Sequence, residues 1–240
     1  MTFEERIQAG LAGKYQGLNN GLGRINKYIF GVQRACYTLL GGLSGSAKTT
    51  LVDFIIINAL EDALAKNIPI NIFYYCLEID EMSKRANWLS VLIYKKYDII
   101  ISPEKIKGLG DNRLTEDELK LVMDETPNLN LLFSKIKWFF ESTNPTGVYN
   151  TLWKHMETRG TFEKENYVDE EGKTKQRIVR FVFTNPEEYN IVVGDHLALF
   201  KTERGYNLKQ NLDKLSEYSI ILRNLFKMTF FWLQQFNQGL

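Results

Sequence analysis

The stretch from Gly42 to Thr49 (GLSGSAKT) constrains the fold of this chain more than any other part of the sequence. It follows the strand-like run 35–40 and precedes a long apolar helix pattern over 50–66. A loop between a strand and a helix turns successive backbone N–H groups inward, and the helix adds its positive N-terminal end. The pattern therefore predicts an α/β fold with a cradle for the phosphates of a nucleoside triphosphate. Its expected contacts are Gly42, Ser44, Gly45, Ser46, Ala47, Lys48, Thr49 and Thr50.

Two side chains in this stretch suit the chemistry of a nucleoside triphosphate. Lys48 would neutralise the β- and γ-phosphates, and the Thr49 hydroxyl would ligate the Mg²⁺ ion that bridges them. The alternative is a glycine-rich turn whose lysine is merely solvated. The strand before the loop and the helix after it favour phosphate binding, because the motif requires both contexts.

Ala47 departs from the pattern G-x-x-x-x-G-K-[ST], which has a glycine before the lysine. We expect this residue to lie near the start of the helix with a negative φ, where a methyl group costs little. The sequence therefore predicts a slightly altered loop that still binds phosphate.

The composition is typical of one large α/β domain with a full core. The 240 residues are 44% hydrophobic, and the longest apolar runs are too short to span a bilayer. The first residues (MTFEER) lack a signal-peptide pattern, so we expect no membrane contact and a cytoplasmic location. Cys36 and Cys76 lie in apolar strand-like runs, which predicts core residues rather than metal ligands.

A net charge of +1 gives no overall basic field for nucleic acid. Any such contact must be local, as in a ring-shaped protein that holds a strand in its channel with a few cationic loops per subunit. Neutrality therefore does not exclude a nucleic-acid partner.

The segment 1–34 is interpreted as a lead-in to an ATPase core at 35–240. Its start has an amphipathic helix pattern with Phe3, Ile7 and Leu11 on one side. We expect this helix to pack on the core or on a neighbouring subunit of a homo-oligomer.

Glu78 directly follows the buried strand pattern 68–77. In an open α/β sheet, ligands bind beyond the carboxyl ends of the strands, so this carboxylate should face the same crevice as the phosphate loop. There it could act as a general base on the water that attacks the γ-phosphate. The alternative is a helix N-cap or first-turn acid, because a helix pattern continues from Asp80 and Glu81.

Strands that alternate with helices predict a mostly parallel sheet with covered faces. A capping box from Thr115 to Glu118 begins one helix, the run 135–141 is strand-like, and another helix follows Pro145. Segment 162–185 breaks this rhythm, because two β-prone arms flank a turn-like stretch at 169–173. We expect an inserted, charged and projecting β-hairpin, which is either merely solvated or binds a partner.

Asp195 ends the apolar strand pattern that begins at Tyr189. An acid at this end of a strand can hold Mg²⁺ through water, opposite Thr49. The alternative is an aspartate that caps the next turn. His196 follows directly, and we assign it no catalytic role.

The last two elements are a core-facing helix and a strand. Apolar residues at spacings of three and four predict the helix over 208–226, and the run 229–233 is typical of a buried strand. A polar amide within the following QQFN stretch (234–237) is placed to sense the γ-phosphate.

Together these motifs resemble the RecA-like motor domain of DnaB-type replicative helicases, which are P-loop NTPases. The likeness runs from about Gly17 onward and rests on the order of the phosphate loop, CLEI at 76–79, GDHL at 194–197, the leucine-striped helix and QQFN at 234–237. The segment RLTEDE at 113–118 is similar to the one that this family places between its second helix and its middle strand.

The resemblance implies a hexameric ATPase that uses ATP and Mg²⁺ and translocates along single-stranded DNA. It also implies roles for single residues: Lys48 and Thr49 as phosphate and metal ligands, Glu78 as catalytic glutamate, Asp195 as second metal acid and Gln235 as sensor glutamine. The family's main DNA-contacting loop and arginine finger lie beyond the last of these motifs. We therefore expect slow ATP hydrolysis from this 240-residue form.

Two other interpretations stay open from the sequence. The chain could be a nucleotide-binding structural or assembly module that uses its hairpin as a contact surface. It could also be a RecA-like ATPase for recombination or packaging.

Overall fold

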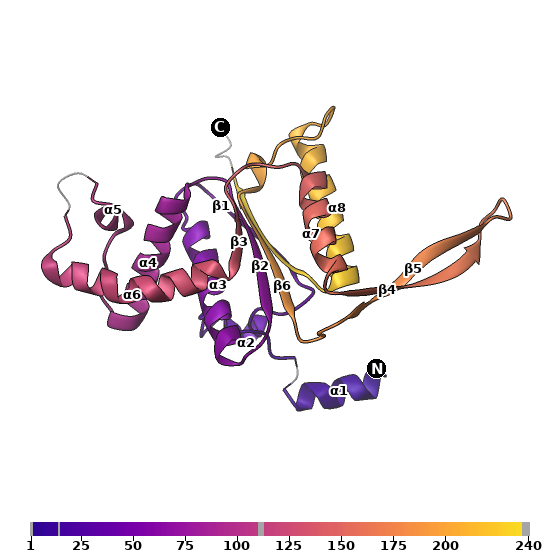
Figure 1. The fold of residues 1–240 in the computed structure, drawn as a ribbon, viewed down its shortest axis with the longest axis horizontal. Helices are drawn as coiled ribbons and strands as arrows, with labels where there is room; N and C mark the ends of the chain where they lie inside the picture. Colours follow the sequence, from indigo (N-terminus) through magenta and orange to yellow (C-terminus); the bar gives the residue numbers. More distant parts are fainter. Residues whose placement is uncertain (1, 14, 110–112, 237–240) are drawn as a thin grey trace.

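The computed structural model describes residues 2–13, 15–109 and 113–236. Its central sheet has five strands, all paired in parallel, in the order β1-β7-β6-β2-β3 (Figure 1). These strands are β1 (Tyr37–Gly42), β2 (Ile70–Cys76), β3 (Ile136–Phe139), β6 (Tyr189–Asp195) and β7 (Thr229–Gln235). The parallel α/β architecture predicted from the sequence is confirmed.

Helices cover both faces of this sheet (Figure 1). One layer holds α3 (Lys48–Ala65), α4 (Glu81–Tyr97), α5 (Pro103–Ile106) and α6 (Glu116–Ser134), and the other holds α7 (Pro145–Glu157) and α8 (Leu208–Phe226). A short 3₁₀ turn, η1 (Leu197–Leu199), follows β6. No helix in the described part of the chain combines the length and the apolar character needed to cross a bilayer.

Alternation along the strands divides the core between the two helical layers. In β2, Ile72 and Tyr74 pack toward α3, α4 and α6, whereas Phe73 and Tyr75 pack toward α7 and α8. A strand covered on both faces needs apolar residues at successive positions, and every residue of β6 is accordingly buried. The site residues at the strand ends thus rest on a core that is packed from both sides.

Several element boundaries differ from the expected ones. β1 starts at Tyr37 and includes Gly42, so the phosphate loop begins as the last residue of a strand. For the same reason Cys36, which precedes β1, is only partly buried, and the expectation of a core residue is wrong for it. Cys76 is buried as expected, and the capping box of Thr115 and Glu118 forms.

The expected hairpin is formed by β4 (Gly160–Val168) and β5 (Thr174–Phe183), which pair only with each other and project from the body of the molecule (Figure 1). At its base, Phe181 packs against Phe226 of α8, with the ring centroids 4.8 Å apart.

Further out, both arginines of the hairpin pair with acids of the facing strand. Arg180 contacts Glu163 at 2.6 Å, and Arg177 pairs with Glu165 across the two strands. Because the positive and negative charges cancel within the hairpin, it has little of the net positive potential that would attract nucleic acid.

The N-terminal segment includes α1 (Phe3–Leu11) and the four-residue α2 (Asn26–Ile29). No residue of α1 is buried, and Phe3, Ile7 and Leu11 are 78%, 46% and 77% exposed. The first of the two expectations for this helix, packing on the chain's own core, is therefore wrong.

Candidate nucleotide site

The phosphate loop lies at the carboxyl edge of the sheet, between β1 and α3. The register of β1 with β7 sets Gly42 beside Gln235, and the register of β2 with β6 sets Cys76 beside Asp195. Because these four parallel strands end at one edge, the loop, Asp195, Gln235 and the turn with Glu78 after β2 come together there.

A cavity of about 330 Å³ opens at this edge. It is lined by Ser44, Gly45, Ser46, Ala47, Lys48, Thr49, Thr50, Glu78, His196 and Gln235. Every expected nucleotide contact except Gly42 is in this set, and so are all three residues expected to take part in catalysis, Lys48, Glu78 and Gln235.

Gly42 is not among the residues that line the cavity, but it lies against the Ser46 and Lys48 side chains of the loop. A Cβ atom on Gly42 would stand 2.6 Å from Ser46 Oγ, so the loop closes only over a residue without a side chain. Ser46 Oγ donates to Leu43 O at 2.8 Å and fixes the bend of the loop.

The Lys48 side chain lies over the loop instead of extending into solvent. Its Nζ donates to Gly42 O at 3.0 Å and to Leu43 O at 2.7 Å. These two hydrogen bonds differ from the alternative of a lysine whose ammonium contacts only solvent. The ammonium instead lies among the cavity-lining residues, where it can exchange carbonyl partners for phosphate oxygens.

The expectation for Ala47 is wrong. Its φ is +58° and its ψ is 26°, which is the left-handed region, and it is the N-cap of α3 without a side-chain cap. In this region a Cβ approaches the following carbonyl oxygen and costs about 1 kcal/mol or more relative to glycine. The loop therefore keeps the backbone shape that glycine would allow more readily.

Thr49 and Asp195 form the contact at the start of α3. Thr49 Oγ1 donates to Asp195 Oδ2 at 2.8 Å, and Asp195 is only 2% exposed. Burial raises the pKa of this carboxyl above its ordinary value, while the positive charge of Lys84 and the Thr49 hydrogen bond act to lower it. The alternative that Asp195 caps the next turn is not observed, because the N-cap of η1 is His196.

Glu78 lies in the turn between β2 and α4, with its side chain exposed to the cavity. The N-cap of α4 is Asp80, whose Oδ1 accepts from Ser83 N at 2.8 Å, and the helix starts at Glu81. Glu78 is therefore neither the N-cap nor a first-turn acid. Its charge is close enough to Asp195 to raise the pKa of that buried carboxyl.

Gln235 lines the cavity, and it is the last residue of β7, because this strand extends two residues further than the expected run 229–233. Asn237, the last residue of the QQFN stretch, lies outside the described residues.

His196 is a cavity residue to which the sequence assigned no role. Its Nδ1 is buried, and no hydrogen-bond partner for it lies within the described part of the chain. A histidine that directly follows a strand-end acid is the signal that could have drawn attention to it.

A buried ionic cluster lies behind the site and was missed altogether. Lys84 on α4 contacts Asp53 on α3 and Tyr74 on β2, and all three side chains are nearly inaccessible to solvent. Burial and the charge of Asp53 raise the pKa of Tyr74 well above its ordinary value. The signal was present in the sequence, since Lys84 shares a helix face with Trp88 and Leu92, and both of those residues are buried.

The residues present fit ATP and Mg²⁺. Main-chain N–H groups at a helix start and a lysine are donors for phosphate, and the Thr49 hydroxyl and Asp195 carboxylate are the hard oxygen ligands that Mg²⁺ prefers. Among the described residues, no group of three or more His, Cys, Asp or Glu side chains could hold a metal ion.

Many solved structures match the fold of this chain, and two of them are compared with it. One, described as a DnaB-like replicative helicase and its interactions with primase, aligns with a TM-score of 0.60 at 14% identity. That alignment covers 92% of this chain but only 45% of the helicase chain. The other, described as an ATPase domain, aligns with a TM-score of 0.63 at 15% identity, over 99% of this chain and 72% of that domain's chain.

No protein-family model and no curated protein matches the sequence. At identities this low, the structural likeness establishes the fold alone. The chain has the RecA-like fold of DnaB-type ATPase domains, as the motifs led us to expect.

Proposed function

We propose that this chain is an ATP-hydrolysing motor domain that acts on single-stranded DNA, with segment 1–34 as a lead-in to an ATPase core at 35–240. One observation carries the proposal: the phosphate loop, the Thr49–Asp195 contact and Glu78 converge at one cavity on the carboxyl edge of the sheet. The helicase-type fold supports the same conclusion.

In this proposal, the phosphate loop binds and orients the triphosphate. Backbone N–H groups from Ser44 onward and the positive end of α3 face the phosphates, and Lys48 moves from the carbonyls of Gly42 and Leu43 to phosphate oxygens. The main-chain donors are fixed by the loop and by the start of α3, and Lys48 alone has to change its hydrogen-bond partners.

Thr49 and Asp195 are the residues that would hold the metal. When bound, Mg²⁺ supplies charge stabilisation to the phosphoryl oxygens. Burial of Asp195 fixes its carboxylate, and the hydrogen bond from Thr49 aligns the two oxygen ligands before the ion arrives. With the ion bound, the Thr49 hydroxyl would serve as an oxygen ligand and Asp195 would hold the ion through water.

Glu78 is the proposed general base. It is exposed to the cavity and free of any capping role, so its carboxylate can accept a proton from the attacking water. Gln235, at the end of β7, is the proposed sensor of the γ-phosphate.

The test is ATP hydrolysis by the whole chain with and without single-stranded DNA, alongside Lys48→Ala. We expect DNA-stimulated turnover that this variant abolishes. A ligand at a hundredfold excess over its dissociation constant stabilises the protein that binds it by about 2.7 kcal/mol. We therefore expect ATP to raise the melting temperature of the parent chain but not that of Lys48→Ala. Binding without turnover would instead favour a nucleotide-dependent assembly module.

We also propose a homo-oligomer, a hexamer by family resemblance, in which α1 contacts a neighbouring subunit. Phe3, Ile7 and Leu11 form an apolar ridge that is left exposed by the described residues of this chain. Phe3→Ser/Leu11→Ser should lower the mass measured by light scattering, whereas Gln8→Ser on the same helix should not. An unchanged mass in the double variant would exclude this role for α1.

A further inference from the structure

The buried cluster behind the site joins three elements through one ammonium group. Lys84 Nζ on α4 lies 3.1 and 3.0 Å from the two carboxylate oxygens of Asp53 on α3. It also lies 3.0 Å from the hydroxyl oxygen of Tyr74 on β2, and that hydroxyl donates to Asp53 Oδ1 at 2.8 Å. The exposed fractions of Lys84, Asp53 and Tyr74 are 0%, 2% and 0%.

A cluster of this kind is a poor way to stabilise a fold. The desolvation of two buried charges offsets most of their attraction, and apolar residues of similar volume often do as well or better. Its geometry, however, is far more specific than apolar packing, because each hydrogen bond fixes both a distance and a direction.

All three elements border the site: α3 carries the phosphate-binding residues at its start, and β2 and α4 flank the turn that holds Glu78. Asp53 lies in the second turn of α3, the helix that starts with Lys48 and Thr49. Tyr74 is near the end of β2, and Lys84 is in the first turn of α4. The turn with Glu78 connects Tyr74 to Lys84 at this edge, so both of its ends are attached to the phosphate-loop helix.

We propose that Lys84 is a positioning residue, which fixes the Glu78 turn relative to the phosphate loop by binding Asp53 and Tyr74. This inference rests on the proposed role of Glu78 as a base. A general base must lie within hydrogen-bond reach of its water, and a misplacement of 1 Å can cost about a hundredfold in rate.

A second lysine on the same helix supplies a matched control. Lys95, in the last turn of α4, donates to Asn58 Oδ1 at 2.9 Å and pairs with Glu61, both on α3. It ties the same two helices together but lies far along α4 from the Glu78 turn. If α4 only needed to be docked on α3, losing either lysine would have the same effect.

The main variant is Asp53→Asn/Lys84→Met, which removes both buried charges and keeps side chains of similar size, and it is compared with Lys95→Met. We expect kcat for Mg-ATP to fall roughly ten- to hundredfold in the double variant with little change in KM, and to stay near the parent value in Lys95→Met. Amide hydrogen exchange over residues 77–83 should accelerate in the double variant only.

A folded double variant with kcat within twofold of the parent value would overturn the proposal. If the double variant does not fold, Tyr74→Phe decides in its place, because it removes only the hydroxyl. It should lower kcat at least threefold and accelerate exchange over 77–83, and an unchanged kcat would again count against Lys84 as a positioning residue.

Failure of the proposed function gives a different result. In that case the parent chain would bind ATP without turnover, so kcat could not be compared. Amide hydrogen exchange over residues 77–83 would then be the test of whether Lys84 positions the turn. Exchange over 77–83 that is faster in the double variant than in Lys95→Met would support positioning of the turn. Equal exchange in the two variants would overturn it.

Discussion

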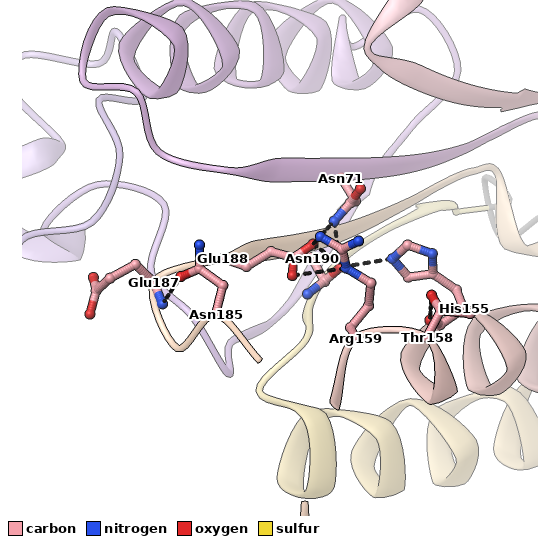
Figure 2. Close-up of polar contacts among 8 residues, drawn as sticks. All are labelled: Asn71, His155, Thr158, Arg159, Asn185, Glu187, Glu188 and Asn190. Carbon is pink, nitrogen blue, oxygen red and sulfur yellow. Dashed lines mark hydrogen bonds and ion pairs between the residues drawn. The ribbon is translucent and has the colours of Figure 1, made fainter. Parts of the chain in front are cut away.

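The two ends of the parallel sheet carry polar clusters of opposite kinds. At the carboxyl end, Lys48, Glu78 and Gln235 line an open cavity. At the other end, buried Glu188 accepts from Arg159 Nε at 2.9 and 3.0 Å and from Asn71, and these partners point toward one another in Figure 2.

The second cluster is closed by its own members. Asn190 Oδ1 accepts from Asn71 Nδ2 at 3.1 Å and contacts His155 Nε2 at 3.2 Å (Figure 2). The hairpin starts from this cluster, because Thr184 N donates to the backbone oxygen of Arg159 at 2.9 Å.

This comparison separates structural from functional polarity. A buried polar group that is hydrogen-bonded within the chain helps to specify one structure. Polar groups that line a cavity remain able to bind a ligand. Substitutions at the closed end should therefore change stability, and substitutions at the open end should change binding or rate.

The largest expected effect is on catalysis. Glu78→Gln keeps the shape of the side chain but removes the base, so ATP hydrolysis should fall by roughly two to four orders of magnitude. ATP-dependent thermal stabilisation should persist. Glu188→Gln, the same change at the closed end, should leave kcat near the parent value. Equal loss of binding and turnover in Glu78→Gln would make Glu78 a structural acid.

The next effect is on folding. Arg159→Met removes the main partner of Glu188, whose side chain is 1% exposed, and leaves a buried carboxylate without its counter-charge. Because Arg159 itself is 38% exposed, we expect a loss of about 3 kcal/mol, at the lower end for breaking a buried pair. Urea unfolding of the parent chain and of Arg159→Met measures this difference in the free energy of unfolding. ATP affinity should not change, and a weaker affinity would show that the two ends are coupled.

Much of this arrangement could be predicted from the sequence. Apolar runs that end in Glu78, Asp195 and the QQFN stretch located the carboxyl edge, because parallel strands bring such ends together. The closed cluster could not be predicted in this way. Its members come from β2, α7, the residue before β4, and β6 with the residue before it, and no local pattern specifies which of them will meet.

The backbone conformation of the phosphate loop was also predicted wrongly, at Ala47. The motif fixes the order of residues but not their dihedral angles, and Ala47 in the left-handed region shows that loop geometry overrode the preference of an alanine. Lys84 was missed because a lysine within a helix is ordinarily assigned to solvent, and only the apolar character of its face argued otherwise.

A third, smaller effect tests the loop geometry. Ala47→Gly should raise the free energy of unfolding by about 1 kcal/mol, since glycine adopts a φ of +58° without steric cost. The same change at Ala59, inside α3, should lower it by about 1 kcal/mol or more. Chemical denaturation compares the two. A destabilised Ala47→Gly would mean that the residue is not held in the left-handed region in solution.

The smallest effect is a pH dependence at the closed end. Burial, with the nearby charges of Lys137 and Arg159, lowers the pKa of His155, against the opposing effects of Asn190 and Glu188. In the unfolded chain the imidazole takes up a proton near its ordinary pKa of about 6.5, whereas in the folded chain it stays neutral to lower pH. The contribution of His155 to the free energy of unfolding is therefore present in full above the unfolded-state pKa of about 6.5. It is lost as the pH falls from there toward the lowered pKa of the folded state.

His155→Gln isolates this contribution, because an amide can still donate to Asn190 Oδ1 but does not titrate. Unfolding free energies of the parent chain and of the variant, measured at intervals from neutral pH to mildly acidic pH, should converge as the pH falls. Because His196 and all acidic groups are common to both chains, the difference between the two curves reports on His155 alone. Parallel curves would show that this imidazole is as accessible to protons as in the unfolded chain, and that the amino end of the sheet is more open than its hydrogen bonds indicate.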